Sequence, residues 1–297
     1  MTYSFRDINT CAFCGSSDLK ILGKRLNTSQ GKAPWKKSGI KTTIVKCRHC
    51  GLIFPNPMPI PDNIQDHYGI PPESYWKPEY FTIPEDHLHG LISWMNEIQK
   101  IEPGAKILDI GAGLGKNMIA FKRKGYDAYG VEPSHPFYER AVSMMGIDPS
   151  KLKEASIEDC DYEENMFDVI YFTAVLEHLY SPAEILDKIM KWLKPKGLIF
   201  IEVPSSDWLI NKIGNFYYKL MGSDYVSNLS PLHSPYHLYE FSKKSFEEHS
   251  KHNNYEIAAC RYFICETFMP RFLDPLLKKY MKMTNTGMEL AIWLRKN

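Results

Sequence analysis

Three glycines directly after a short apolar run constrain the fold more than any other feature of the sequence. The run covers residues 106–110, and Gly111, Gly113 and Gly115 follow it at alternate positions. Because glycine has no Cβ, it lets the backbone turn sharply and approach a ligand closely. Residues 116–124 continue as a predicted helix whose free N–H groups face the same turn. The stretch therefore predicts a strand, a turn and a helix that form a cradle for a nucleotide-type cofactor.

The spacing of these glycines distinguishes between cofactor classes. A dinucleotide fingerprint would read G-x-G-x-x-G, but position 116 is a lysine, which disfavours a pyrophosphate ligand. A second predicted strand, residues 126–132, ends in Glu132. A carboxylate accepts two hydrogen bonds and a ribose presents two adjacent hydroxyls, so Glu132 is a candidate ribose ligand. A tight turn without a ligand is the alternative for the glycines alone.

The motifs that follow resemble those of class I S-adenosylmethionine (SAM) methyltransferases. The D-x-G-x-G-x-G turn, a strand at residues 167–172, a turn at 175–179 and a helix-to-strand passage at 193–201 occur in the order of that family. The resemblance implies an α/β, Rossmann-like sheet over residues 87–297, mostly parallel with its last strand antiparallel. It also implies SAM as cofactor, with Ser156 and Ile157 beside the adenine and Thr173 near the reacting methyl. The candidate cofactor residues are Asp109, Gly111, Gly113, Gly115, Glu132, Ser156, Ile157 and Thr173.

Two C-x-x-C pairs near the N-terminus, each followed by glycine, predict a metal site. The pairs are Cys11/Cys14 and Cys47/Cys50, in a chain with seven cysteines. Two such turns can bring four thiolates to one zinc ion in a closed structural site, without an open position for substrate. We therefore expect a zinc-ribbon-like module at residues 1–60, with a loop inserted between the pairs. A redox dithiol or unrelated buried cysteines are the alternatives.

Charge and hydropathy narrow the classes of partner. The chain of 297 residues has 36 basic and 35 acidic side chains and a formal charge of +1, which disfavours a nucleic-acid partner. Local charged patches remain possible. No apolar run reaches 18 residues and the N-terminus has no signal-like apolar core, so a cytoplasmic protein without a transmembrane segment is the expectation.

Two segments contain many aromatic side chains, one before the predicted catalytic domain and one inserted within it. Residues 61–86 are rich in proline and aromatics and predict an extended linker, which either packs the two modules together or covers the cofactor. Residues 206–239 interrupt the end of the fold and are our candidate acceptor cap. The apolar run at 208–221 within this cap has two alternatives, a membrane-facing surface or a homodimer interface.

Histidine is the natural base for a hydroxyl or amine acceptor near neutral pH. His178 follows the predicted fourth strand, whereas His233, His237 and Tyr239 lie at the end of the cap. These four residues are the candidate catalytic groups. Each histidine has a structural alternative as a hydrogen-bonded residue of the fold.

The sequence as a whole resembles zinc-containing methyltransferases of surface-polysaccharide and natural-product biosynthesis. The expected activity is SAM-dependent methyl transfer to a small molecule, with a sugar hydroxyl of a nucleotide-linked or polysaccharide precursor as the favoured acceptor. A ribosomal RNA methyltransferase with a zinc ribbon and a SAM-binding protein without catalysis are the alternatives.

Overall fold

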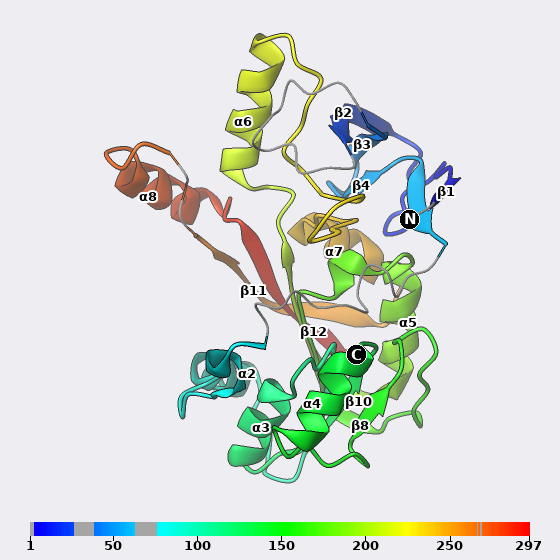
Figure 1. The fold of residues 1–297 in the computed structure, drawn as a ribbon, viewed down its shortest axis with the longest axis vertical. Helices are drawn as coiled ribbons and strands as arrows, with labels where there is room; N and C mark the ends of the chain where they lie inside the picture. Colours follow the sequence, from blue (N-terminus) through cyan, green and yellow to red (C-terminus); the bar gives the residue numbers. More distant parts are fainter. Residues whose placement is uncertain (1–2, 27–38, 63–75, 266, 268) are drawn as a thin grey trace.

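The computed structural model describes residues 3–26, 39–62, 76–265, 267 and 269–297. Its centre is a seven-stranded sheet with the order β11-β12-β10-β9-β6-β7-β8 (Figure 1). The strands are β6 (Lys106–Ile110), β7 (Asp127–Glu132), β8 (Leu152–Glu154), β9 (Phe167–Thr173), β10 (Leu193–Pro204), β11 (Tyr255–Phe263) and β12 (Glu289–Lys296).

Strand directions agree with the sequence-based expectation. β6 pairs in parallel with β7 and β9, and β9 pairs in parallel with β10. β12, the last strand of the chain, is antiparallel to both of its neighbours, β10 and β11. The predicted mostly parallel Rossmann-like sheet with an antiparallel last strand is therefore confirmed. Ligands of such sheets lie at the carboxyl ends of the parallel strands.

The helices that pack beside the sheet are α2 (His89–Ile98), α3 (Lys116–Arg123), α4 (His135–Ser143), α5 (Pro182–Trp192) and α7 (Lys243–Ser250). Two further helices, α6 (Leu209–Leu220) and α8 (Asp274–Thr284), project from it (Figure 1), and short 3-10 turns form η2 (Pro78–Phe81) and η3 (Leu176–His178). In α2, Ile92 and Met95 are buried, whereas Leu91 and Ile98 are half-buried. Trp94 of the same helix is also buried, with its ring 6.1 Å from those of Phe200 and Trp293.

The N-terminal region forms two small sheets beside the large one. β2 (Leu19–Leu26), β3 (Lys41–Cys47) and β4 (Ile53–Pro55) make an antiparallel sheet, and β1 (Tyr3–Arg6) pairs with β5 (Met58–Pro61). We call residues 3–61 the cysteine module. Parts of the expected inserted loop (27–38) and linker (63–75) lie outside the described residues.

The cysteine module shares its core with the catalytic domain. The Phe13 ring lies 5.5 Å from Phe241 and 5.7 Å from Phe246 at the start of α7. Both Ser242 and Ser245 donate hydrogen bonds to the carbonyl of Cys50. The module is therefore packed into the main body of the fold and does not stand apart from it.

Within the parts of the chain that the structure describes, no helix combines the length and the apolar character that a membrane crossing requires.

Candidate active site

The glycine turn has the conformation that the sequence predicts. Gly111, Gly113 and Gly115 all have positive φ angles, of 75°, 54° and 73°. A Cβ at Gly111 would lie 2.5 Å from Val175 Cγ2, and one at Gly115 would lie 2.6 Å from Ile147 Cγ1. A Cβ at Gly113 would meet nothing within 4 Å. Packing thus requires glycine at the two outer positions, whereas the middle one borders open space where a ligand fits.

Glu132 closes the other side of this cradle. It is buried, and its two carboxylate oxygens accept hydrogen bonds from the backbone N–H groups of Gly113 (2.7 Å) and Ser134 (2.8 Å). Each oxygen keeps a further lone pair, so the carboxylate can also accept two ligand hydroxyls. The backbone bonds fix its orientation before any ligand arrives.

Asp109, the last acid of β6, lies beneath the turn. It is buried, and its Oδ2 atom has no hydrogen-bond partner among the described residues. Burial raises the pKa of this carboxyl to about 7, an effect that its hydrogen bond to Asn117 partly opposes. An orphaned buried oxygen beside a glycine cradle fits a polar ligand group at this place.

Aromatic residues of the linker contact the helices that begin at the cradle. The Trp76 ring lies 5.1 Å from Phe137 of α4 and has the Arg140 guanidinium 4.0 Å from its centre. The Lys116 ammonium, at the start of α3, lies 5.3 Å from the centre of the Tyr80 ring. These contacts place the described end of the linker beside the two helices, and both alternatives for its role stay predictions. Two further aromatics of this segment, at positions 68 and 75, lie outside the described residues.

The other predicted cofactor residues surround the same edge of the sheet. Ile157 is buried, and Ser156 Oγ donates to Asp159 Oδ2 at 2.8 Å in the turn after β8. Thr173 ends β9, and its buried Oγ1 has no partner among the described residues. β7 and β8 end side by side, with Glu132 opposite Glu154. The roles of Ser156, Ile157 and Thr173 in cofactor binding stay predictions.

Two of the predicted catalytic histidines meet at the end of β9. The rings of His178 and His237 are 4.9 Å apart, and their Nε2 atoms lie 3.9 and 4.0 Å from Glu177 Oε1. Backbone bonds hold the two segments together, because Leu238 and Tyr239 donate N–H groups to the Glu177 carbonyl. We call Glu177, His178 and His237 the acceptor-side cluster.

Burial determines the protonation states of the three side chains in the acceptor-side cluster. It raises the pKa of Glu177 to about 8, with help from the charges of Glu202 and Glu289. It lowers the pKa of His178 to about 4 and that of His237 to about 3, the latter with help from His178. At neutral pH the carboxyl is therefore mostly protonated and both imidazoles are neutral, so each ring has one unprotonated nitrogen.

His233 and Tyr239 lie in other surroundings. The His233 Nε2 is 3.1 Å from an Arg25 guanidinium nitrogen of the cysteine module, and that guanidinium also donates to the Tyr225 hydroxyl at 2.6 Å. Tyr239 is buried against Phe54, and its hydroxyl donates to the Tyr180 carbonyl at 3.3 Å. The structure thus places both residues at the contact between module and catalytic domain.

Sequence reasoning did not predict that Glu240 and Arg25 fix the cap to the cysteine module. Glu240 is buried and accepts hydrogen bonds from the Asn228 side chain and the Leu229 N–H, and its backbone pairs with Ile53 of β4. Arg25 makes the second contact, described above. Both charged residues are visible in the sequence, but their burial, which brings them into contact with distant segments, cannot be read from the sequence alone.

The four predicted metal ligands converge. Their Sγ atoms all lie within 4.8 Å of one another, and the pairs Cys11–Cys50 and Cys14–Cys47 are 3.5 Å apart. A tetrahedral zinc with Zn–S bonds of about 2.3 Å places its sulfurs roughly 3.8 Å apart, so the donor set fits this ion. Positive φ angles at Gly15 and Gly51 allow the two turns. His49, between two of the cysteines, instead pairs with Glu248 at 3.0 Å.

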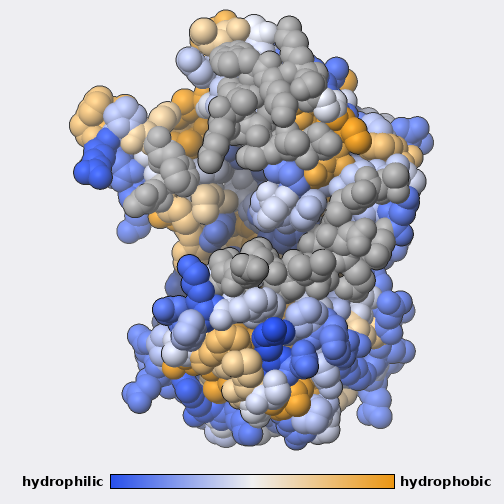
Figure 2. Space-filling view, in the orientation of Figure 1, coloured by the Kyte–Doolittle hydropathy of each residue, from blue (hydrophilic) through white to orange (hydrophobic). Residues whose placement is uncertain are grey.

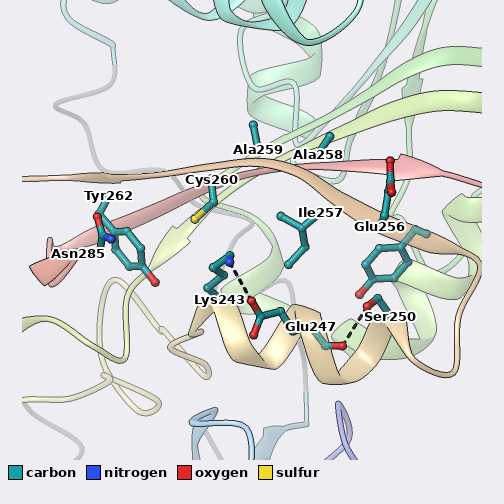
Figure 3. A pocket seen from close by; sticks show the side chains of 11 residues that line it. Lys243, Glu247, Ser250, Glu256, Ile257, Ala258, Ala259, Cys260, Tyr262 and Asn285 are labelled. Atoms are coloured by element: carbon teal, nitrogen blue, oxygen red, sulfur yellow. Dashed lines mark hydrogen bonds and ion pairs between the residues drawn. The ribbon is translucent and has the colours of Figure 1, made fainter.

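A cavity of about 620 Å³ lies away from this edge, between α7 and β11 (Figure 3). Lys243 and Glu247 of α7 form an ion pair of 2.9 Å that faces Ile257 and Cys260 of β11. None of the predicted site residues lines this cavity. The candidate site therefore remains at the carboxyl edge of the parallel strands.

Comparison with known families agrees with this geometry. A family model described as a methyltransferase domain matches residues 86–259, more than half of the chain. The chain belongs to this methyltransferase family. The match includes the glycine cradle, Glu132 and His178, and ends within β11.

Curated methyltransferases align with parts of this family domain. Phosphoethanolamine N-methyltransferase 1 of Zea mays is 31% identical over 105 residues, 34% of this chain and 21% of that protein. (S)-coclaurine N-methyltransferase of Papaver somniferum is 29% identical over 157 residues, 47% of this chain and 44% of that protein. The chain thus spans less than half the length of either relative.

Solved methyltransferase structures also overlay on the chain. The plantazolicin methyltransferase BpumL, in complex with SAH, gives a TM-score of 0.48 at 17% identity, covering 76% of this chain and 93% of that one.

Proposed function

We propose that the protein is a SAM-dependent methyltransferase that acts on a small-molecule acceptor. The observation that carries the proposal is the arrangement of two sites at one edge of the sheet. The glycine turn with Glu132 forms a cofactor cradle, and the end of the neighbouring β9 leads into a cluster with two neutral imidazoles. Membership of the methyltransferase family supports the same conclusion.

In this proposal Gly113 leaves room for the cofactor, and the Glu132 carboxylate accepts hydrogen bonds from its ribose hydroxyls. When bound, SAM would supply a sulfonium methyl group, whose carbon an acceptor nucleophile attacks in line with the neutral thioether as the leaving group. His237 takes up the proton that the O–H or N–H of the methyl acceptor loses, because its imidazole is neutral and one ring nitrogen is unprotonated. His178 donates its Nδ1–H to the Tyr236 carbonyl (3.3 Å), which holds its ring against His237.

The favoured acceptor is a hydroxyl of a sugar-containing precursor. This finer proposal depends on the sequence resemblance to polysaccharide and natural-product methyltransferases. The relatives are named instead for phosphoethanolamine, coclaurine and ubiquinone biosynthesis. They include both N- and O-methyltransferases, so the acceptor atom is a question for experiment.

Zinc in the four-cysteine site has a structural role in this proposal. The thiolate set forms a closed site, and the module holds the cap segment that carries His237. The overall charge of +1 continues to disfavour an RNA acceptor.

The direct test is transfer of labelled methyl from SAM into fractions of nucleotide sugars, phenols, amines and RNA. Label in a small-molecule fraction, lost in Glu132→Gln but retained in the neighbouring-strand control Glu154→Gln, would support the proposal. Label in the RNA fraction would contradict it. Cofactor binding with no label in any fraction would favour a binding protein without catalysis.

A further inference from the structure

Helix α8 presents an apolar face that the rest of the fold does not cover. Leu276, Tyr280 and Met283 are 66%, 52% and 74% exposed, and Phe272 in the preceding turn is 80% exposed. Their spacing of four, four and three residues places them along one side of the helix. Figure 2 shows this projecting part as apolar atoms beside strongly hydrophilic ones.

Helix α6 repeats the pattern. Phe216, Tyr217, Leu220 and Met221 are 63%, 53%, 69% and 58% exposed, and no residue of this helix is buried. Both helices lie at the end of the molecule opposite α3 (Figure 1). Exposed apolar side chains gathered in this way on each of two helices are uncommon on a protein surface and mark a contact surface.

The charged residues within these two helices are lysines, apart from one acid. α6 contains Lys212 and Lys219, of which Lys212 pairs with Asp207, just before the helix, at 3.2 Å. α8 contains Lys278, Lys279 and Lys282, and its single acid, Asp274, pairs with Lys278 at 2.7 Å. The net charge of the whole chain is only +1, so these two helices concentrate positive charge in one region.

We propose that α6 and α8 form a docking surface for an anionic lipid bilayer. Amphipathic helices with aromatic and aliphatic residues on one side and lysines on the other lie in the interfacial layer of such membranes. A second copy of the chain fits less well, because a twofold contact would bring the lysines of each helix against like charges of its partner.

The position of this surface relates it to the acceptor-side cluster. α6 follows β10, which ends at Pro204, and α8 leads into β12, which begins at Glu289 opposite Pro204. Both helices therefore extend from the sheet edge that holds the candidate site. On the basis of the proposed function, docking brings that site to an acceptor carried by a lipid.

Vesicle binding of the full-length protein tests the docking surface without cofactor or acceptor. We expect binding to vesicles of phosphatidylcholine mixed with phosphatidylglycerol, and little binding to phosphatidylcholine alone. The double substitution Lys279→Glu/Lys282→Glu should lower the affinity at least about tenfold, because each basic residue near the surface contributes. The matched control Lys122→Glu/Lys124→Glu changes the same charge on exposed positions of α3 and its end, and should bind like the native protein.

The apolar component has a test of its own. Leu276→Ser/Met283→Ser removes two exposed side chains, so the fold should be retained, as circular dichroism would check, while vesicle binding falls. Equal binding to neutral and anionic vesicles, or none to either, would overturn the proposal. So would light scattering that shows a dimer which these substitutions dissociate. Cofactor affinity, measured in parallel, distinguishes failure of docking from failure of the proposed methyl transfer.

Discussion

The cofactor side and the acceptor side of the candidate site are built in different ways. The cofactor side uses residues from adjacent strands and turns, such as Gly113 and Glu132, joined by one hydrogen bond. The acceptor side joins the turn after β9 to a cap segment that the cysteine module holds through Arg25 and Ile53. We therefore expect the cofactor side to keep its geometry without the cysteine module, whereas the acceptor side depends on that module.

The largest expected effect comes from breaking the metal site with Cys14→Ser. A structural zinc contributes on the order of 10 kcal/mol to the folding of a small module, and its loss should loosen residues 3–61. Because the module holds the cap, turnover should be lost while cofactor affinity is retained. Metal content, isothermal titration with SAM and turnover measure the three effects, and Cys260→Ser is the control outside the set. Loss of cofactor binding as well would show that the two sides form one folding unit.

His237→Ala tests the acceptor side at a single side chain. Removal of a general base should lower turnover by about 10²–10⁴-fold without a change in cofactor affinity. His233→Ala is the matched control from the same segment, because that ring contacts Arg25. Similar losses in both variants would mean that these histidines support the cap and that neither is the base.

Glu132→Gln tests the cofactor side. The glutamine NH2 donates hydrogen bonds and cannot accept them as the second carboxylate oxygen does, so we expect cofactor affinity to fall by about 1–3 kcal/mol. Glu154→Gln, at the paired position of β8, is the control. Unchanged affinity in Glu132→Gln would remove this residue from the site.

The last prediction concerns the fold and not the cofactor or acceptor, and it is read from the pH dependence of stability. Burial raises the pKa of Glu177 from its ordinary 4.5 to about 8, so between these values the unfolded chain releases a proton that the folded protein keeps. The stability from this group is complete below pH 4.5 and is lost as the pH rises through about 8. Glu177→Gln should therefore show a flatter decline of the unfolding free energy across this window. Denaturant titrations at its two ends measure the difference, and parallel profiles would contradict the shifted pKa.

The sequence predicted the cofactor side of the site more completely than the acceptor side. Strand ends, the glycine turn and the four-cysteine set depend on local patterns, and the structure contains each of them. The partners of His233 and Cys50 lie 208 and 192 residues away along the chain, and no local pattern connects them. The protonation of Glu177 depends on burial, which only the packed structure determines.

The contact between Cys50 and Ser242 also bears on how the chain is made. The cysteine module leaves the ribosome before the catalytic domain, and the residues that cover Phe13, at 241 and 246, are synthesised more than 220 residues after it. Until then the module must keep this apolar surface exposed, a state that favours aggregation. Early capture of zinc would hold the half-finished module in shape during this interval, so metal supply during translation should affect the yield of folded protein.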